Sequence, residues 1–326
     1  MHNNRRKKHT LRNLGMWFVL LFILGGAAFG MTRYRSVKSA ANSSFAPSGI
    51  IKQRDVNSEL KNKKPISILL VGIDTNSSVK NYQGNTNSMM VLTLNPDTQK
   101  TTITSIPRDI AVKKINGSNS DKAATISSAY SVNGTRTAIT TVEKLLNIPV
   151  DFYALINMGG MGKAINEVGG VDVTPETSFS FGGYTFTKGV KTHMNGNKAM
   201  AYVRSRANDD TTRQGRQRQV LTSLVSQSKS IATLFNQDLI DSVTDQIQTD
   251  LTFDQMTTLA KNYSSVGKTT TDDSLKGTAA EVDGQSMETV KNSELQRVTD
   301  SIRDNLGLEK ATTGNIEYVV TSNANY

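Results

Sequence analysis

The fold of this chain is decided by the stretch Ile66-Ser67-Ile68-Leu69-Leu70-Val71-Gly72-Ile73, an almost continuous apolar run. A strand buried on both faces has this pattern, because helices cover each side of its sheet. Two further strand patterns, at 88–94 and 100–106, flank the turn Asn95-Pro96-Asp97. The sequence therefore predicts neighbouring strands at the centre of a sheet.

Helical patterns follow these strands. Apolar residues at three- and four-residue spacing predict helices at 123–130, 135–146 and 158–168, with a strand at 149–156. This alternation predicts an α/β fold, a three-layer α/β/α sandwich with a central mixed sheet. Weaker patterns continue to the C-terminus: a β segment at 171–186, helices at 195–202, 213–235, 251–263 and 286–306, and a polar loop at 268–273.

Pro107 ends the strand pattern at 100–106, since proline cannot donate to a sheet ladder and fixes its own φ. Arg108 is then held at a strand end, where open α/β sheets bind ligands. Its planar guanidinium suits phosphate oxygens. Alone, the pentapeptide Ser105-Ile106-Pro107-Arg108-Asp109 favours a surface arginine at an ordinary strand end. The other positive charges of the chain decide between the two interpretations.

More arginines gather after residue 203. Arg204 and Arg206 point to the same side if their segment is extended. Arg213 and Gln217 are four residues apart on the inward face of the expected helix, which costs desolvation unless they meet an anion or an acceptor. The N-terminal end of a helix also favours negative charge.

Arg216 and Arg218 lie on other faces of this helix, where they could be solvated. The alternative for the whole segment is an exposed basic helix start. Asp74, also at a strand end, could bring a divalent cation, since Mg²⁺ binds through one or two carboxylates plus substrate phosphates. Arginines at strand and helix ends, together with Asp74, indicate a phosphate or pyrophosphate ligand.

Composition excludes several other kinds of site. The chain has no Cys, which excludes thiol catalysis, Cys-based zinc sites and disulfides. Only His193 lies in the expected folded part, beside the Asn195-Gly196 turn, and we interpret it as a surface residue. The net charge of +10 includes a basic N-terminal tail, so it is weak support for nucleic-acid binding.

The N-terminus predicts the location of the protein. The apolar run from Leu14 to Met31 carries no charge and can just span a bilayer as a helix. A cleaved signal peptide is the alternative, with Gly25-Gly26-Ala27-Ala28 as a weak cleavage site. Basic residues before the span predict a cytoplasmic N-terminus and an external domain: Arg5, Arg6, Lys7, Lys8 and Arg12.

The sequence resembles the LytR-CpsA-Psr family of bacterial cell-wall proteins. The resemblance covers about residues 65 to 235, behind the expected short tail and single span. It rests on five blocks in order: Leu70 to Asp74, Ser105 to Asp109, Glu167 to Val173, Asn195-Gly196 with Ala199 to Arg206, and Arg213 to Gln217.

This resemblance implies a phosphotransferase that moves an anionic glycopolymer, of the teichoic acid or capsular polysaccharide type, from a polyprenyl-pyrophosphate carrier to peptidoglycan through a phosphodiester link. The prenyl tail would lie in an apolar tunnel between sheet and helices. The implied pyrophosphate-binding residues are Arg108, Arg204, Arg206, Arg213 and Gln217, of which Arg108, Arg204 and Arg206 are the implied catalytic residues.

The resemblance also implies a metal site for Mg²⁺ (or Mn²⁺) at Asp74. The family usually has a second ligand in Arg-Ser-Asp before the second strand, and here the matching stretch is Asn85-Thr86-Asn87. Asn87 can coordinate through its oxygen but lacks the charge. A non-catalytic polyprenyl-phosphate binder and a membrane-bound transcriptional regulator are the alternative functions, although no helix-turn-helix pattern appears.

The expected organisation has five segments: a cytoplasmic tail at 1–13, a transmembrane anchor at 14–32, an extracellular linker at 33–64, the catalytic core at 65–235, and a C-terminal helical part at 236–326 that packs on the core. The expected location is the cell membrane of a Gram-positive bacterium, with the membrane, the lipid-linked glycopolymer and peptidoglycan as partners and no nucleic acid.

Overall fold

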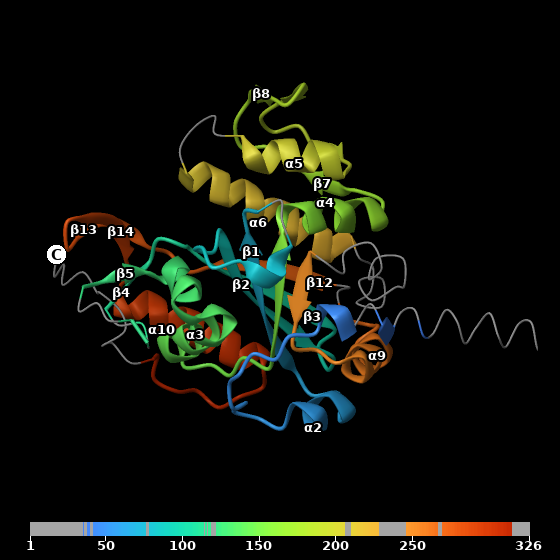
Figure 1. Cartoon of the computed structure of the whole chain (residues 1–326), viewed down its shortest axis with the longest axis vertical. Helices are drawn as coiled ribbons and strands as arrows, with labels where there is room; N and C mark the ends of the chain where they lie inside the picture. The colour runs from blue at the N-terminus through green and yellow to red at the C-terminus, as the bar shows by residue number, and fades with distance from the viewer. Residues whose placement is uncertain are drawn as a thin grey trace, which may run out of the picture.

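A six-stranded mixed sheet forms the centre of the computed structural model (Figure 1). The structure describes residues 35, 38–39, 42–75, 78–113, 115, 117–118, 122–205, 210–227, 246–266 and 269–314. The strand order is β11-β6-β1-β2-β3-β12. Their bounds are β1 Ile66–Ile73, β2 Ser88–Asn95, β3 Lys100–Ile106, β6 Phe152–Asn157, β11 Ile247–Thr249 and β12 Thr269–Ser274.

Strand directions bring several chain ends to one edge of this sheet. β2 runs antiparallel to both β1 and β3, while β6 is parallel to β1 and β12 is parallel to β3. The carboxyl ends of β1, β3, β6 and β12 therefore share one edge with the start of β2. This is the edge at which open α/β sheets bind ligands.

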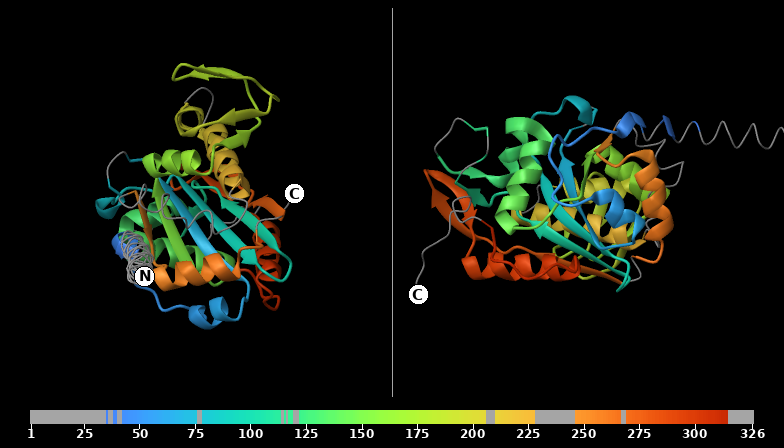
Figure 2. Two further views of the ribbon diagram at one scale, coloured as in Figure 1. Left: turned by 90° about the vertical axis from the view of Figure 1, so that its right-hand side faces the viewer. Right: turned by 90° about the horizontal axis from the view of Figure 1, so that it is seen from below.

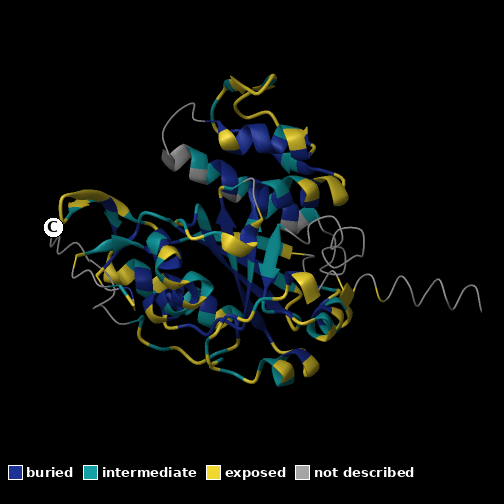
Figure 3. Ribbon diagram, in the orientation of Figure 1, coloured by how far each residue is buried: buried dark blue, intermediate teal, exposed yellow. Residues whose placement is uncertain are grey.

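Helices cover both faces of the sheet, as the two views of Figure 2 show. One face packs against α2 (Val56–Lys61), α4 (Met158–Glu167), α5 (Gly196–Arg204), α6 (Asp210–Gln227) and α9 (Phe253–Asn262). The other face packs against α3 (Ala129–Leu146) and α10 (Asn292–Asn305). Successive residues of β1 serve the two layers, Ile68 one and Leu69 the other. The predicted α/β fold with a mixed central sheet is confirmed, and its central strands are the most deeply buried part (Figure 3).

Smaller elements surround these layers. Four two-stranded sheets pair β4 (Ala111–Val112) with β5 (Ala124–Thr125), β7 (Val171–Val173) with β10 (Thr192–Met194), β8 (Phe179–Phe181) with β9 (Tyr184–Phe186), and β13 (Thr278–Val282) with β14 (Gln285–Thr289). Two single-turn helices, η1 and η2, span Val79–Asn81 and Ile126–Ser128.

Three predictions about local structure were wrong. The polar loop at 268–273 is the edge strand β12, in which Thr269, Thr270 and Thr271 suit an extended backbone through their branching at Cβ. The helix predicted at 286–306 is strand β14 followed by α10. The helix at 123–130 is β5 and η2 leading into α3, because Ala124 and Thr125 pair with β4.

The segment before β1 lies against the domain. It was predicted as a linker over 33–64, yet Leu60 is buried in the core and Phe45 forms a bridge with Thr249. Arg54 forms a salt bridge with Asp151, whose carboxylate is almost wholly buried and also accepts the Ser67 N–H at 2.8 Å. The described residues of this stretch thus contribute to the folded unit. The domain boundaries remain predictions.

The predicted transmembrane span at 14–32 lies outside the described residues. Within the described ranges, the structure contains no helix that is both long and apolar enough to cross a membrane.

We predict that Arg54→Met lowers the free energy of unfolding by about 3 kcal/mol, because it leaves the buried Asp151 carboxylate without its cation. Urea unfolding of the purified protein measures this. Lys61→Met, at an exposed position of α2, is the matched control and is expected to change it by less than about 0.5 kcal/mol. Equal stability of the two variants would show that the Arg54 pair does not stabilise the fold.

Candidate active site at the carboxyl edge of the sheet

Arg108 lies in the turn that ends β3, as predicted from Pro107. Ile106 still pairs with Met89, and the chain then turns so that the Ile110 N–H bonds to the Pro107 carbonyl at 3.4 Å. The Arg108 carbonyl accepts the Ser127 N–H at 3.1 Å, which fastens the turn to η2. The Arg108 guanidinium lies 3.4 Å from the Asp109 carboxylate. This turn fixes a half-buried cation at the carboxyl edge of the sheet.

A cavity of about 380 Å³ opens beside Arg108. Its walls come from the start of β2, the end of β3, the segment before β8, helix α6, the connection from β12 to β13, and strand β14. Polar and charged side chains of every wall reach it: Asn87, Ser88, Ser105, Arg108, Glu176, Gln217, Ser274, Lys276 and Glu288. Segments distant in sequence therefore place donors and acceptors around one space.

Gln217 is brought to this cavity by α6, and it is only 4% exposed. The prediction that this position faces inward is confirmed. The side-chain amide of glutamine carries both a donor and an acceptor, so it can bind a phosphate oxygen. Ser105 adds a buried hydroxyl, for which the structure shows no hydrogen-bond partner among the described residues.

Arg216 is a buried residue, and its predicted solvation was wrong. Its side chain is 3% exposed and donates a hydrogen bond to the Ser205 carbonyl. The guanidinium lies 4.9 Å from the ring centre of Phe179 and 5.8 Å from that of Tyr202. Carbonyl and ring faces compensate the cost of burying this charge. Arg216 thereby fixes the N-terminal half of α6, and so Gln217, against α5 and the β8–β9 hairpin.

Tyr202 supports the same junction. Its hydroxyl donates to the Gln219 side chain at 2.7 Å, and Gln219 in turn donates to Glu176 at 2.9 Å. Burial raises the pKa of Tyr202 to about 12, so the hydroxyl keeps its proton and remains a donor at neutral pH. The chain Tyr202–Gln219–Glu176 links α5 and α6 to a wall of the cavity.

The other predicted cationic residues lie differently. Arg204 is the last residue of α5 and is exposed, so the condition under which Arg204 and Arg206 point to the same side, an extended segment, is not met up to Arg204. Arg213 is half-buried on α6. Within the described part of the chain, neither of these two side chains lines the cavity of Arg108 and Gln217. Arg206 lies outside the described residues.

Asp74 and Asn87 face the same edge of the sheet from neighbouring strands. Gly72 pairs with Ser88, and the Asn87 N–H bonds to the Gly72 carbonyl at 2.8 Å, so the two predicted metal ligands flank the end of this pairing. Asp74 is exposed and Asn87 is half-buried. The pKa of Tyr82 is raised by burial and further by the charge of Asp74, which places this carboxylate near η1.

The donor set suits a hard cation only in part. One carboxylate and one amide oxygen are ligands of the kind that Mg²⁺ accepts, with substrate phosphates completing the shell. Over the described ranges, no group of three His, Cys, Asp or Glu side chains could hold a metal by itself. A cation here would therefore need the oxygens of the bound substrate.

A family model describing the LytR_cpsA_psr family matches residues 31–304, most of the chain. The chain belongs to this family. The predicted resemblance is confirmed, and the match extends well beyond residues 65 to 235. It includes α9, the β13–β14 hairpin and all of α10 except its last residue.

Known members of the family are similar over most of their length. The polyisoprenyl-teichoic acid–peptidoglycan teichoic acid transferase TagU of Enterococcus faecalis is 35% identical over 292 residues, covering 88% of this chain and 94% of TagU. Protein gbs0355 of Streptococcus agalactiae has a similar structure, with a TM-score of 0.70 and 28% identity over 83% of this chain and 96% of that one. The structure of TagT bound to LI-WTA gives a TM-score of 0.62 and 26% identity over 79% and 95%.

We expect Arg216→Met to lower the free energy of unfolding by about 2 kcal/mol, because the variant keeps the length of the side chain but loses the bond to the Ser205 carbonyl and the ring contacts. Chemical denaturation tests this, with Arg136→Met as the control at an exposed arginine of α3. An Arg216→Met protein as stable as this control would mean that the buried guanidinium contributes nothing net.

Proposed function

We propose that this chain is a membrane-anchored phosphotransferase that moves an anionic glycopolymer from a polyprenyl-pyrophosphate carrier to a sugar hydroxyl of peptidoglycan. The observation that carries this proposal is the meeting of Arg108 and Gln217 in one cavity at the carboxyl edge of the sheet. The printed names of the relatives support the teichoic acid class of polymer. The product is a phosphodiester link, and the prenyl phosphate leaves.

Phosphoryl transfer depends on positioning and charge stabilisation more than on a covalent catalyst. Arg108, held by its turn, places a guanidinium against phosphate oxygens and stabilises the charge that develops on the departing prenyl phosphate. Gln217 orients another oxygen through its amide. Arg204, Arg206 and Arg213 are proposed to complete this binding set, as the family resemblance implies.

Mg²⁺ or Mn²⁺ is the proposed cofactor, held by Asp74 and Asn87 at the edge next to the cavity. When bound, the cation neutralises charge on the pyrophosphate. With only one carboxylate in this pair, the affinity for the free metal is weak and the pyrophosphate supplies much of the binding charge.

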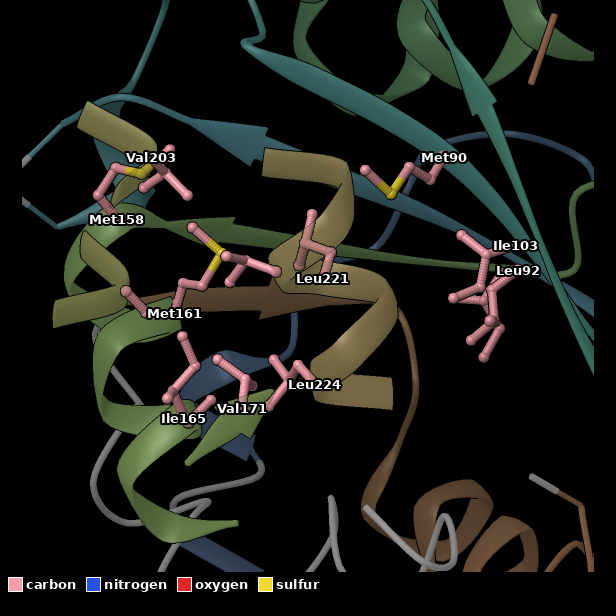
Figure 4. Packing of buried hydrophobic residues seen from close by; sticks show 14 of the residues in the cluster. Met90, Leu92, Ile103, Met158, Met161, Ile165, Val171, Val203, Leu221 and Leu224 are labelled. Carbon is pink, nitrogen blue, oxygen red and sulfur yellow. The ribbon is translucent and has the colours of Figure 1, made fainter. Parts of the chain in front are cut away.

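A methionine-rich cluster between the sheet and the helices is the proposed site of the prenyl chain. Met161 of α4 points toward Leu221 of α6, Met158 of α4 lies by Val203 of α5, and Met90 lies further along the sheet (Figure 4). Methionine is unbranched and flexible, so a methionine-lined layer can adapt to an inserted apolar chain. The predicted span at 14–32 would hold this proposed site near the bilayer that contains the lipid-linked donor.

A second candidate function is favoured by Asn87. A protein with a weakened metal site could hold polyprenyl phosphates without transferring the polymer. Binding without turnover distinguishes this possibility from the transferase.

Arg108→Gln tests the transferase. Supplied with a pyrophosphate-linked lipid saccharide, peptidoglycan fragments and Mg²⁺, the wild-type protein should form the phosphodiester product. Loss of the guanidinium should lower kcat by about 100-fold or more, as for the removal of one charge-stabilising donor. Lys113→Gln, an exposed lysine after β4 outside the cavity, should keep the wild-type rate. Tight donor binding with no product from the wild-type protein would contradict the transferase and support the binder.

Asn87→Asp should tighten the dependence of transfer on metal. The substitution restores a second carboxylate, so half-maximal activity should occur at a Mg²⁺ concentration about tenfold lower, which corresponds to about 1.4 kcal/mol of added binding. A titration of the initial rate with Mg²⁺ measures this shift, with Asn85→Asp as the control in the same loop. If the Asn87→Asp curve overlays that of the wild-type protein, the metal is held elsewhere.

A further inference from the structure

Glu288 is brought beside Arg108 by the β13–β14 hairpin. The backbone N–H of Glu288 bonds to the Asp109 carbonyl at 2.8 Å, and Glu288 forms a parallel bridge with Ile110. The strand that carries Glu288 is therefore fastened directly to the turn that carries Arg108. This attachment fixes the backbone of a carboxylate residue in the wall of the cavity.

The side chain of Glu288 is held over a glycine in the same wall. A Cβ atom at Gly277 would collide with the Glu288 carboxylate, so the absence of a side chain at 277 lets the carboxylate lie against the backbone there. Both residues line the cavity, together with Arg108 and Gln217. Glu288 thus lines the cavity from β14, whereas Gln217 lines it from α6.

The other carboxylates near the cavity already have partners. Asp109 pairs with Arg108 at 3.4 Å, and Glu176 accepts from Gln219 at 2.9 Å. For the Glu288 carboxylate, the described residues provide neither an ion pair nor a hydrogen bond. A half-buried carboxylate without a protein partner is available to a ligand.

The electrostatic surroundings of Glu288 suit proton transfer. Burial raises its pKa, and the charge of Asp109 raises it further. The other charged side chains around the cavity are Arg108 on the β3 turn, Lys276 after β12 and Glu176 before β8. A carboxylate with a raised pKa is a better base than an ordinary exposed glutamate.

We propose that Glu288 is the general base that accepts the proton of the acceptor sugar hydroxyl. This inference rests on the proposed transferase function. The hydroxyl oxygen attacks the phosphorus that bears the glycopolymer, and its proton passes to the Glu288 carboxylate. The new P–O bond replaces the bond to the bridging oxygen, whose electron pair leaves with the prenyl phosphate, while Arg108 stabilises the oxygens of the leaving group.

Glu288→Gln tests this role, because glutamine has nearly the same shape but cannot take the proton at neutral pH. In the transfer assay, kcat should fall by about 100-fold or more, while the Kd for the pyrophosphate-linked lipid saccharide stays within about twofold. In the wild-type protein, kcat should also decline as the pH falls through the raised pKa of Glu288, and this decline should be absent in the variant. Glu281→Gln, an exposed glutamate of β13 in the same hairpin, is the matched control and should behave as wild type.

Two further variants separate a chemical role from a structural one. Glu288→Asp keeps the base and should restore part of kcat together with the decline at low pH. Gly277→Ala keeps the carboxylate but displaces it, and should lower kcat without changing donor affinity. Unfolding midpoints of all variants show whether the fold is intact, and a loss of kcat that follows the loss of stability across the series overturns the proposal.

The two proposals fail in different ways. Product formation by wild type with full kcat in Glu288→Gln overturns the general base and leaves the transferase standing. Absence of product from wild type, with the donor bound, overturns the transferase itself.

Discussion

The pairing of β1 with β2 on one side and β6 on the other is the constraint on which the rest of the molecule depends. β1 is buried along almost its whole length, so its backbone groups must be satisfied by these neighbours. The antiparallel register with β2 then sets Asn87 opposite the end of β1. The parallel register with β6 sends the next helix, α4, across the face on which α5 and α6 lie. The location of the site at one edge follows from these two registers.

Burial of Arg216 is the second determinant of the site. Arg216 is only 3% exposed, so its guanidinium needs partners inside the protein. A backbone carbonyl and two aromatic rings are such partners. The guanidinium lies against the rings of Phe179 and Tyr202, and its bond to the Ser205 carbonyl ties α6 to the C-terminal end of α5. Gln217, the next residue, then has little freedom to face anything other than the cavity.

The parts of the fold that could be predicted from sequence are those in which one local pattern has one structural solution. A continuous apolar run such as Ile66–Ile73 is compatible with a strand between two helical layers, and Pro107 can only end the strand before it. The edge strand β12 was missed because, among the described residues, one of its sides has no neighbouring strand. An edge strand can carry polar residues, and this polar pattern is typical of a loop. The hairpin strand β14 was missed because it is short and runs directly into α10, so the apolar spacing of the helix masked it.

The same distinction between local patterns and contacts with distant elements applies to the candidate site. Arg108 and Gln217 were found because each occupies an element end or an inward helix position, which the local sequence reveals. The buried environment of Arg216 depends on Phe179 and Tyr202, and these come from other elements of the chain. Glu288 gives no local signal at all, since its position follows from the bond between its backbone and the Asp109 carbonyl.

The distribution of charge in the cavity follows from the chemistry it would serve. Cationic and amide donors on the β3 turn and α6 attract a pyrophosphate, whereas a carboxylate among them would repel it. Glu288 lines the cavity from strand β14. The charge that raises its pKa is that of Asp109, which is itself paired with Arg108. The carboxylate is therefore not neutralised by the arginine that the substrate needs. Because the carboxylate and the cationic donors come from different walls, one cavity could bind a pyrophosphate and also provide a base for the incoming hydroxyl.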